Sequence, residues 1–228
     1  MGYNQKVTMT YTQRKKFTLV WVAALTFLAG AMNVSAILLF NTTISHHTGS
    51  LSRAAMALAE GDFKLFFDMI SYVVLFFFGA MISGLLYYQR NRGVRLLHSL
   101  LPIVFGCVLF IGVWTGNTNE NILRIIAFGM GLQNGTQIRI YGVIVRTTHM
   151  TGTLTDAALS IGHILRGKTD EWDRFLFLVY TLACFLVGGI WAAVSIQQFQ
   201  FATLQIWSIL YLMMGVFVFI FHPIEMKH

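Results

Sequence analysis

The chain has 228 residues, of which 56% are hydrophobic and only 11% are charged. An ordinary soluble domain carries about 25% charged residues, so these proportions argue against a soluble enzyme. The net charge is +7, but the Lys and Arg residues lie between apolar segments and do not form one basic face. We therefore interpret them as signals of membrane topology and expect no nucleic-acid partner.

Apolar stretches recur along the chain, and a membrane span needs about 20 such residues. After a polar tail at 1–16 they predict six transmembrane helices, followed by a second tail at 223–228. The six predicted spans are 17–41, 64–88, 96–115, 122–145, 173–196 and 203–222. Two shorter segments, 49–61 and 152–166, are predicted to be half-helices. The predicted fold class is therefore an all-α membrane protein.

The basic residues predict the orientation. If both termini are cytoplasmic, most Lys and Arg residues lie on the inner side, and the outer loops 116–121 and 197–201 contain none. This distribution obeys the positive-inside rule only if the two short segments do not cross the membrane. If both crossed, Arg90, Arg92 and Arg95 would lie outside. The sequence leaves open whether these segments re-enter or cross.

The sequence also contains an internal repeat. Residues 46–55 (HHTGSLSRAA) resemble residues 149–158 (HMTGTLTDAA), and residues 30–33 (GAMN) resemble residues 131–134 (GLQN). Each copy has three predicted spans and one Thr-Gly half-helix, so repeat 1 covers 17–116 and repeat 2 covers 117–222. Because three crossings are an odd number, the second copy is predicted to be inverted relative to the first.

Inverted repeats are typical of secondary transporters, in which half-helix N-termini point at the solute. A helix start carries free N–H groups and a partial positive charge, which favour a polar or anionic solute. The predicted solute-binding residues are Asn33, Thr48, Gly49, Ser50, Gln133, Asn134, Gln137, Thr151, Gly152 and Thr153. In the alternative interpretation these residues are ordinary helix caps and sites of close helix packing.

The repeat also carries a family resemblance. Residues 129–134 (GMGLQN) and 146–155 (RTTHMTGTLT), together with the first copy, resemble the YoaK-like bacterial membrane proteins over about 29–194. The first copy departs from the pattern, which often has Asp at the position of Asn33 and Asn at the position of Ser50. The resemblance implies a multi-pass protein of the bacterial inner membrane, and it implies no particular substrate.

Two charged residues occupy equivalent positions in the copies, Arg53 and Asp156. Ionisable groups inside a membrane are costly and mark functional sites, so they are predicted to form a central charge pair. In the alternative interpretation Arg53 reaches the outer interface and Asp156 lies at the start of its helix. Arg139, His46 and His149 are further candidates for gating, since histidine can relay protons near neutral pH.

No enzymatic activity is predicted, because the sequence contains no Gly-x-Ser-x-Gly or His-Glu-x-x-His pattern. The histidines and methionines show no metal-ligand spacing, so no metal or other cofactor is predicted. Cys107 and Cys184 both lie inside predicted spans and indicate no disulfide framework.

Two functions fit the sequence. The first is a small inverted-repeat transporter or channel for a polar or anionic solute bound between the two Thr-Gly half-helices. The second is a membrane interaction or lipid-handling protein in which the repeats only pack helices. The expected partners are membrane lipids and a small-molecule solute. A homodimer through the small residues of 79–84 or 188–189 is a further option.

Overall fold

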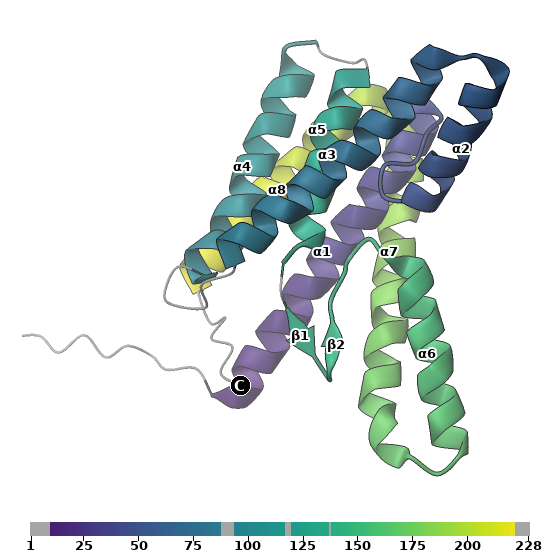
Figure 1. Cartoon of the computed structure of the whole chain (residues 1–228). Coiled ribbons are helices and arrows are strands. Elements are labelled where there is room, and N and C mark those ends of the chain that lie inside the picture. Colours follow the sequence, from purple (N-terminus) through teal and green to yellow (C-terminus); the bar gives the residue numbers. More distant parts are fainter. Residues whose placement is uncertain (1–9, 88–93, 117–119, 137, 222–228) are drawn as a thin grey trace, which may run out of the picture.

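The computed structural model describes residues 10–87, 94–116, 120–136 and 138–221, and nearly all of them are helical (Figure 1). The helices are α1 (Tyr11–Phe40), α2 (His47–Glu60), α3 (Phe63–Tyr87), α4 (Val94–Trp114), α5 (Glu120–Asn134), α6 (Met150–Leu165), α7 (Trp172–Phe199) and α8 (Thr203–Phe221). The remaining elements are strands β1 (Arg139–Ile140) and β2 (Val143–Ile144) and the 3-10 turns η1 (Thr169–Glu171) and η2 (Gln200–Ala202). The fold is therefore all-α with one small hairpin.

Within the described residues, four helical segments are long and apolar enough to cross a membrane. They are Lys15–Phe40, Phe63–Tyr87, Leu97–Trp114 and Thr169–Phe221, and the last contains both α7 and α8. Large apolar side chains such as Phe67 (65% exposed) and Leu186 (63% exposed) face outward from these helices. A soluble protein rarely exposes so much apolar surface, which suits contact with lipid.

The two predicted half-helices are both present as short helices. They correspond to α2 and α6, which begin two residues earlier than the predicted 49–61 and 152–166. Figure 1 shows α2 at one end of the molecule and α6 at the other, each folded back on the helix that follows it. The tight turn after α2 depends on Gly61, whose φ of 79° is accessible mainly to glycine.

The long helices pack in pairs that are distant in sequence: α1 lies along α7, α3 along α5, and α4 along α8. In the first pair, Gly30 lies against the carbonyl oxygen of Phe185, and Gly188 lies against that of Phe27. The second pair repeats this arrangement, with Gly131 against the carbonyl of Phe76 and Gly79 against that of Phe128. Small residues at such crossings allow the two backbones to approach closely, as is common in membrane helices.

The prediction of one continuous transmembrane helix over 122–145 is wrong. Helix α5 ends at Asn134, and β1 and β2 follow as an antiparallel pair. The turn between them is formed by Tyr141 (φ 50°) and Gly142 (φ 77°), and two positive φ values are typical of a type I′ hairpin. The flanking residues Ile138 to Val145 are rich in β-branched side chains, which favour strands over helix.

Candidate functional site

The end of α5 lies in the middle of the molecule. The amide Nε2 of Gln133 donates to the carbonyl oxygen of Leu25 at 2.9 Å, and Leu25 is near the midpoint of α1. The same nitrogen donates to Thr147 Oγ1 at 2.6 Å, and the Tyr211 hydroxyl donates to Gln133 Oε1 at 2.7 Å. Gln133 is 8% exposed. Its hydrogen bonds to Leu25 and Tyr211 join α5 to α1 and α8 at this depth.

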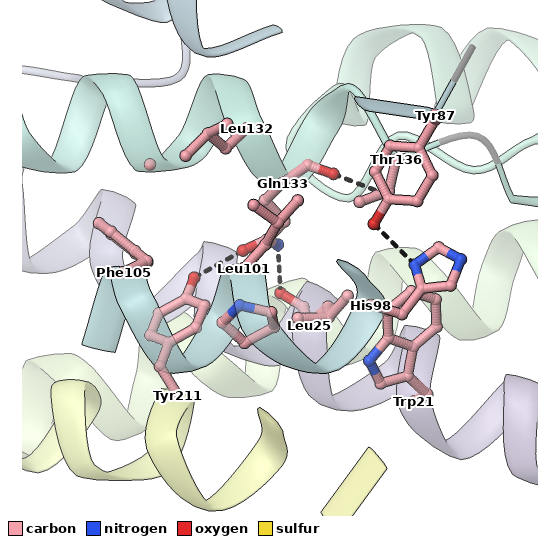
Figure 2. A pocket seen from close by; sticks show the side chains of 12 residues that line it. Trp21, Leu25, Tyr87, His98, Leu101, Phe105, Leu132, Gln133, Thr136 and Tyr211 are labelled. Atoms are coloured by element: carbon pink, nitrogen blue, oxygen red, sulfur yellow. Dashed lines mark hydrogen bonds between the residues drawn. The ribbon is translucent and has the colours of Figure 1, made fainter. Parts of the chain in front are cut away.

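A small cavity adjoins this glutamine (Figure 2). The residues that line it come from α1, α3, α4, α8 and the end of α5, and Figure 2 shows Trp21, His98 and Tyr211 among them. The centre of a water molecule can range over about 20 Å³ in it. Since one water-sized sphere needs about 10–15 Å³, the cavity admits one or two such groups in this conformation.

Two polar atoms at the cavity-lining residues are buried without a protein partner among the described residues. They are the indole Nε1 of Trp21 and Nε2 of His98, and both side chains are 1% exposed. The other ring nitrogen of His98 is hydrogen-bonded to the Tyr87 hydroxyl at 2.9 Å. The Trp21 ring packs edge-on against the His98 ring, with 4.8 Å between the ring centres. A buried polar atom without a partner is costly, so each such atom calls for an explanation.

The predicted amides Asn33 and Asn134 perform similar tasks in the two copies. Asn33 Oδ1 accepts a hydrogen bond from the Ser45 hydroxyl at 2.9 Å, and Asn134 Oδ1 accepts one from the backbone N–H of Thr148 at 3.2 Å. Each asparagine thus holds the loop that leads into the following short helix. The predicted residue Gln137 lies outside the described residues.

The Thr-Gly elements form the first turns of α2 and α6. A Cβ on Gly49 would lie 2.9 Å from His46 Nδ1, and a Cβ on Gly152 would overlap the ring of His149. Each glycine therefore makes room for the histidine three residues before it. The Thr153 hydroxyl donates to the carbonyl of His149 at 3.0 Å, which reinforces the first turn of α6.

The other hydroxyl-bearing residues of the two elements are less uniform. Ser50 is 1% exposed and donates to the carbonyls of Thr43 and His46, each at 3.5 Å. Thr48 and Thr151 are exposed, and their carbonyls accept from the hydroxyls of Ser52 and Thr155. These predicted solute-binding residues surround two separate helix starts.

The predicted charge pair is not formed. Arg53 Nη1 donates to the carbonyl oxygen of Asn41 at 2.9 Å and to Thr42 Oγ1 at 3.1 Å. Asn41 caps the C-terminus of α1, where a cation is favoured by the helix dipole. Asp156 is half-exposed on α6, at the other end of the molecule, and Arg139 is exposed in β1. Sequence equivalence therefore does not bring Arg53 and Asp156 together.

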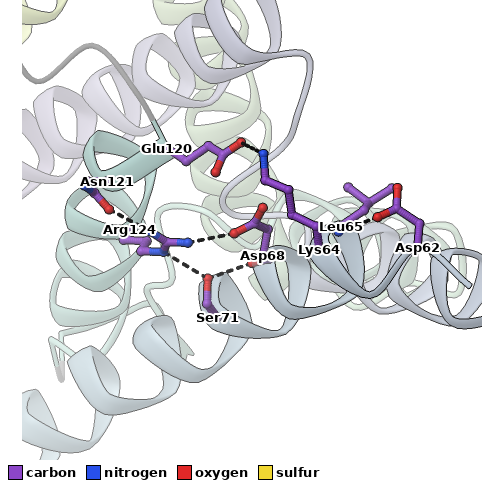
Figure 3. Close-up of polar contacts among 8 residues, drawn as sticks. All are labelled: Asp62, Lys64, Leu65, Asp68, Ser71, Glu120, Asn121 and Arg124. Carbon is purple, nitrogen blue, oxygen red and sulfur yellow. Dashed lines mark hydrogen bonds and ion pairs between the residues drawn. The ribbon is translucent and has the colours of Figure 1, made fainter.

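A different ion pair joins the two halves of the chain (Figure 3). Arg124 Nη2 of α5 contacts Asp68 Oδ1 of α3 at 2.7 Å, and their side chains are 35% and 12% exposed. Arg124 also donates to Asn121 Oδ1 at 2.6 Å and to the Ser71 hydroxyl at 3.4 Å. The presence of an arginine in one predicted apolar span and an aspartate in another was a usable signal, because such charges usually pair.

One further titratable group in the short helices is half-buried, with both of its ring nitrogens inaccessible. The ring of His47, the first residue of α2, packs edge-on against Phe76 with 4.1 Å between ring centres. Both of its ring nitrogens lack a partner among the described residues. Burial, and then the neighbouring His46, lower the pKa of His47 below its usual 6.5. Helix α2 is outside the candidate membrane spans.

Within the described residues no group of three or more His, Cys, Asp or Glu side chains has the geometry of a metal site. Cys107 and Cys184 are free thiols.

Comparison with known proteins identifies the family. The family model described as "Protein of unknown function (DUF1275)" matches residues 21–217, which confirms the resemblance carried by the repeat. No curated protein and no solved structure matches the chain.

Proposed function

Because the chain belongs to DUF1275, a family of proteins of unknown function, its activity must be argued from its site, and we propose a small membrane transporter or channel. Its solute is small and polar and passes the end of α5, beside Gln133. This position replaces the space between the two Thr-Gly helix starts as the centre of the site.

One observation carries the proposal: a helix stops in the middle of an apolar bundle. Non-helical backbone at membrane depth is tolerated only where it is buried in protein or lines a water-filled cavity. The segment after Asn134 fulfils the first condition, since Thr136, Thr147 and Thr148 are buried, and Thr136 is also one of the residues that line the small cavity. Interrupted helices beside a central cavity are the usual place of a transported solute.

The helix pairing supports an inverted-repeat design. Helices α1 and α5 begin the two copies, and α3 and α7 follow the two Thr-Gly helices. In the pairs α1/α7 and α3/α5 the first helix of one copy packs on the later helix of the other, with glycines at the crossing. A two-fold axis in the membrane plane would produce this reciprocal pairing.

The proposed orientation keeps both termini in the cytoplasm, because most basic residues between the spans then lie on the inner side. Helices α2 and α6 would re-enter the membrane from opposite faces without crossing it. The expected location is the bacterial inner membrane.

The test is solute flux into vesicles that contain the purified protein, followed by light scattering with a panel of small polar solutes. Gln133→Met keeps the length of the side chain but removes its hydrogen bonds to Leu25, Thr147 and Tyr211. The matched control is Gln198→Met, because Gln198 is exposed at the end of α7. We expect flux in the wild type and in the control and a large loss in Gln133→Met. Equal flux in all three, or none in folded wild type, would contradict the proposal.

A further inference from the structure

We infer that the hairpin of β1 and β2 binds the phosphate head group of an anionic phospholipid from the inner leaflet, through Arg139 and Arg146. The inference goes beyond the proposed function, because it requires the proposed orientation and no transport. It rests on the depth of the hairpin, on which of its side chains face outward, and on the lack of a counter-charge for the two arginines among the described residues.

The hairpin extends over the depth of one leaflet. At its tip, the ring centre of Tyr141 lies 4.4 Å from Lys15 Nζ, and Lys15 begins the apolar part of α1. At its base, α5 ends beside Leu25, to which Gln133 donates. Lys15 and Leu25 are ten residues apart on α1, or about 15 Å, which is about half of the hydrocarbon thickness of a membrane. Figure 1 shows the tip directed toward the start of α1, which is the cytoplasmic end in the proposed orientation.

The two faces of the hairpin differ in character. Arg139 is paired with Ile144 across the strands, and Arg146 lies two residues further along on the same face. Side chains in such diagonal positions are about 7–8 Å apart, so one phosphate group can accept hydrogen bonds from both guanidinium groups. The outward residues Arg139, Ile144 and Arg146 are exposed, whereas the inward residues Ile138, Ile140, Val143 and Val145 are buried or half-buried.

The two arginines have no counter-charge within the part of the chain that the structure describes. Neither guanidinium has an ion pair or a side-chain hydrogen bond there. The other arginine of the same predicted span differs, because Arg124 contacts Asp68 at 2.7 Å. A charged group at membrane depth is costly without a partner. An anionic head group would supply the missing charge.

The surroundings favour a lipid over a free anion. Ile144 lies between the two arginines and is 43% exposed, so a lipid offers it an acyl chain while its phosphate meets the guanidinium groups. Free phosphate would have to leave water for a partly apolar surface and would gain only the charge contact. Basic positions between membrane helices on the cytoplasmic side are typical places for anionic head groups.

The experiment measures stabilisation of the full chain in a neutral detergent at one salt concentration. Thermal unfolding is followed while dioleoyl phosphatidylglycerol is added, and the lipid concentration that gives half of the full shift is recorded. Dioleoyl phosphatidylcholine has the same chains and no net charge, and sodium phosphate supplies the anion without chains. The test variant combines Arg139→Gln with Arg146→Gln. The matched control combines Arg166→Gln with Lys168→Gln, which removes two exposed cations from the turn between α6 and α7.

We expect phosphatidylglycerol to raise the melting temperature at a lower concentration than phosphatidylcholine, and sodium phosphate to leave it unchanged. Each arginine should contribute about tenfold to the half-maximal concentration, because a hydrogen bond to a charged group is lost. The double variant should therefore need about a hundredfold more phosphatidylglycerol, and the control should need as much as the wild type. If the double variant does not fold, Arg139→Lys and Arg146→Lys keep the charge but lose the paired donors, and each should still raise the half-maximal concentration.

The other outcomes overturn defined parts of the inference. Equal stabilisation by the two lipids would overturn the role of the head-group charge. Equal losses in the double variant and the control would overturn the assignment to the hairpin. Stabilisation by sodium phosphate that is lost in the double variant would overturn the lipid and assign the site to a soluble anion. These measurements need no flux, so their failure is distinct from a failure of the proposed transport.

Discussion

The glycines at the helix crossings give the most direct test of the packing, and α3 supplies both the variant and its control. A Cβ on Gly79 would overlap the carbonyl oxygen of Phe128 and would lie 2.9 Å from the backbone nitrogen of Leu132. On Gly84, in the same helix, an added Cβ would meet nothing within 4 Å. Gly79→Ala should therefore separate α3 from α5, whereas Gly84→Ala should leave the packing unchanged.

The two substitutions should change the free energy of unfolding in opposite directions. Overpacking costs about 1–3 kcal/mol, and the upper half of this range applies because the atoms that Gly79→Ala meets are backbone and cannot rotate away. Replacing glycine by alanine inside a helix returns about 0.5–1 kcal/mol. The net effect is a loss of about 1–2.5 kcal/mol for Gly79→Ala and a gain of about 0.5–1 kcal/mol for Gly84→Ala.

These free energies correspond to measurable shifts. A change of 1 kcal/mol moves the melting temperature of a chain of this size by about 2–4 °C. Gly79→Ala should lower it by about 2–10 °C, and Gly84→Ala should raise it by about 1–4 °C. The assay is thermal unfolding in one detergent at one scan rate. Shifts of the same sign and size in the two variants would refute the close crossing of α3 and α5.

Four other substitutions test the polar contacts. Trp207→Phe should lower the free energy of unfolding by about 1–3 kcal/mol, because the Ser35 hydroxyl loses its donor, while Trp21→Phe should change it little. Asp68→Asn should lower it by about 1–2 kcal/mol, since half-exposed Arg124 loses its partner but stays partly hydrated; unchanged unfolding would argue against this pair. Stability should fall as the pH drops below about 6.5, because the depressed pKa of His47 makes only the unfolded state take up that proton readily. In His47→Gln this part of the acid sensitivity should disappear from pH-dependent melting curves.

The short helices were predictable because their signals are local. The Thr-Gly element, the small residues after it and the glycine that ends α2 all lie within one stretch of sequence. The length and apolarity of α1, α3, α4, α7 and α8 were equally plain, since hydrophobicity over about 20 residues reports a span.

The break after Asn134 was missed because the segment that follows it is as apolar as a helix would be. Its β-branched residues and the pair Tyr141 and Gly142 indicate a hairpin, but they carry little weight within an apolar run. The error is informative, because the place where hydrophobicity predicts a helix and the backbone does not form one adjoins the cavity.

The cavity itself could not be predicted from spacing. Trp21, Tyr87, His98 and Tyr211 belong to four different helices and meet only because those helices pack together. Equivalent positions in the repeat also failed to predict contact, because the equivalent helices lie far apart in the fold. Arg53 and Asp156 match in the repeat, yet α2 and α6 lie at opposite ends of the molecule (Figure 1).

The two copies differ most where they approach the centre. After Asn33 the helix α1 continues to Phe40, whereas after Asn134 the helix α5 stops. At the point where α5 stops, Gly135 packs closely on α3, since a Cβ there would meet the side chain of Ser83 and lie 3.0 Å from the carbonyl oxygen of Ala80. In the first copy the helix is therefore continuous, whereas in the second copy the backbone directly after Gln133 and Asn134 is not helical. Under the proposed function, the solute therefore passes at the place where the two copies of the repeat differ in backbone structure.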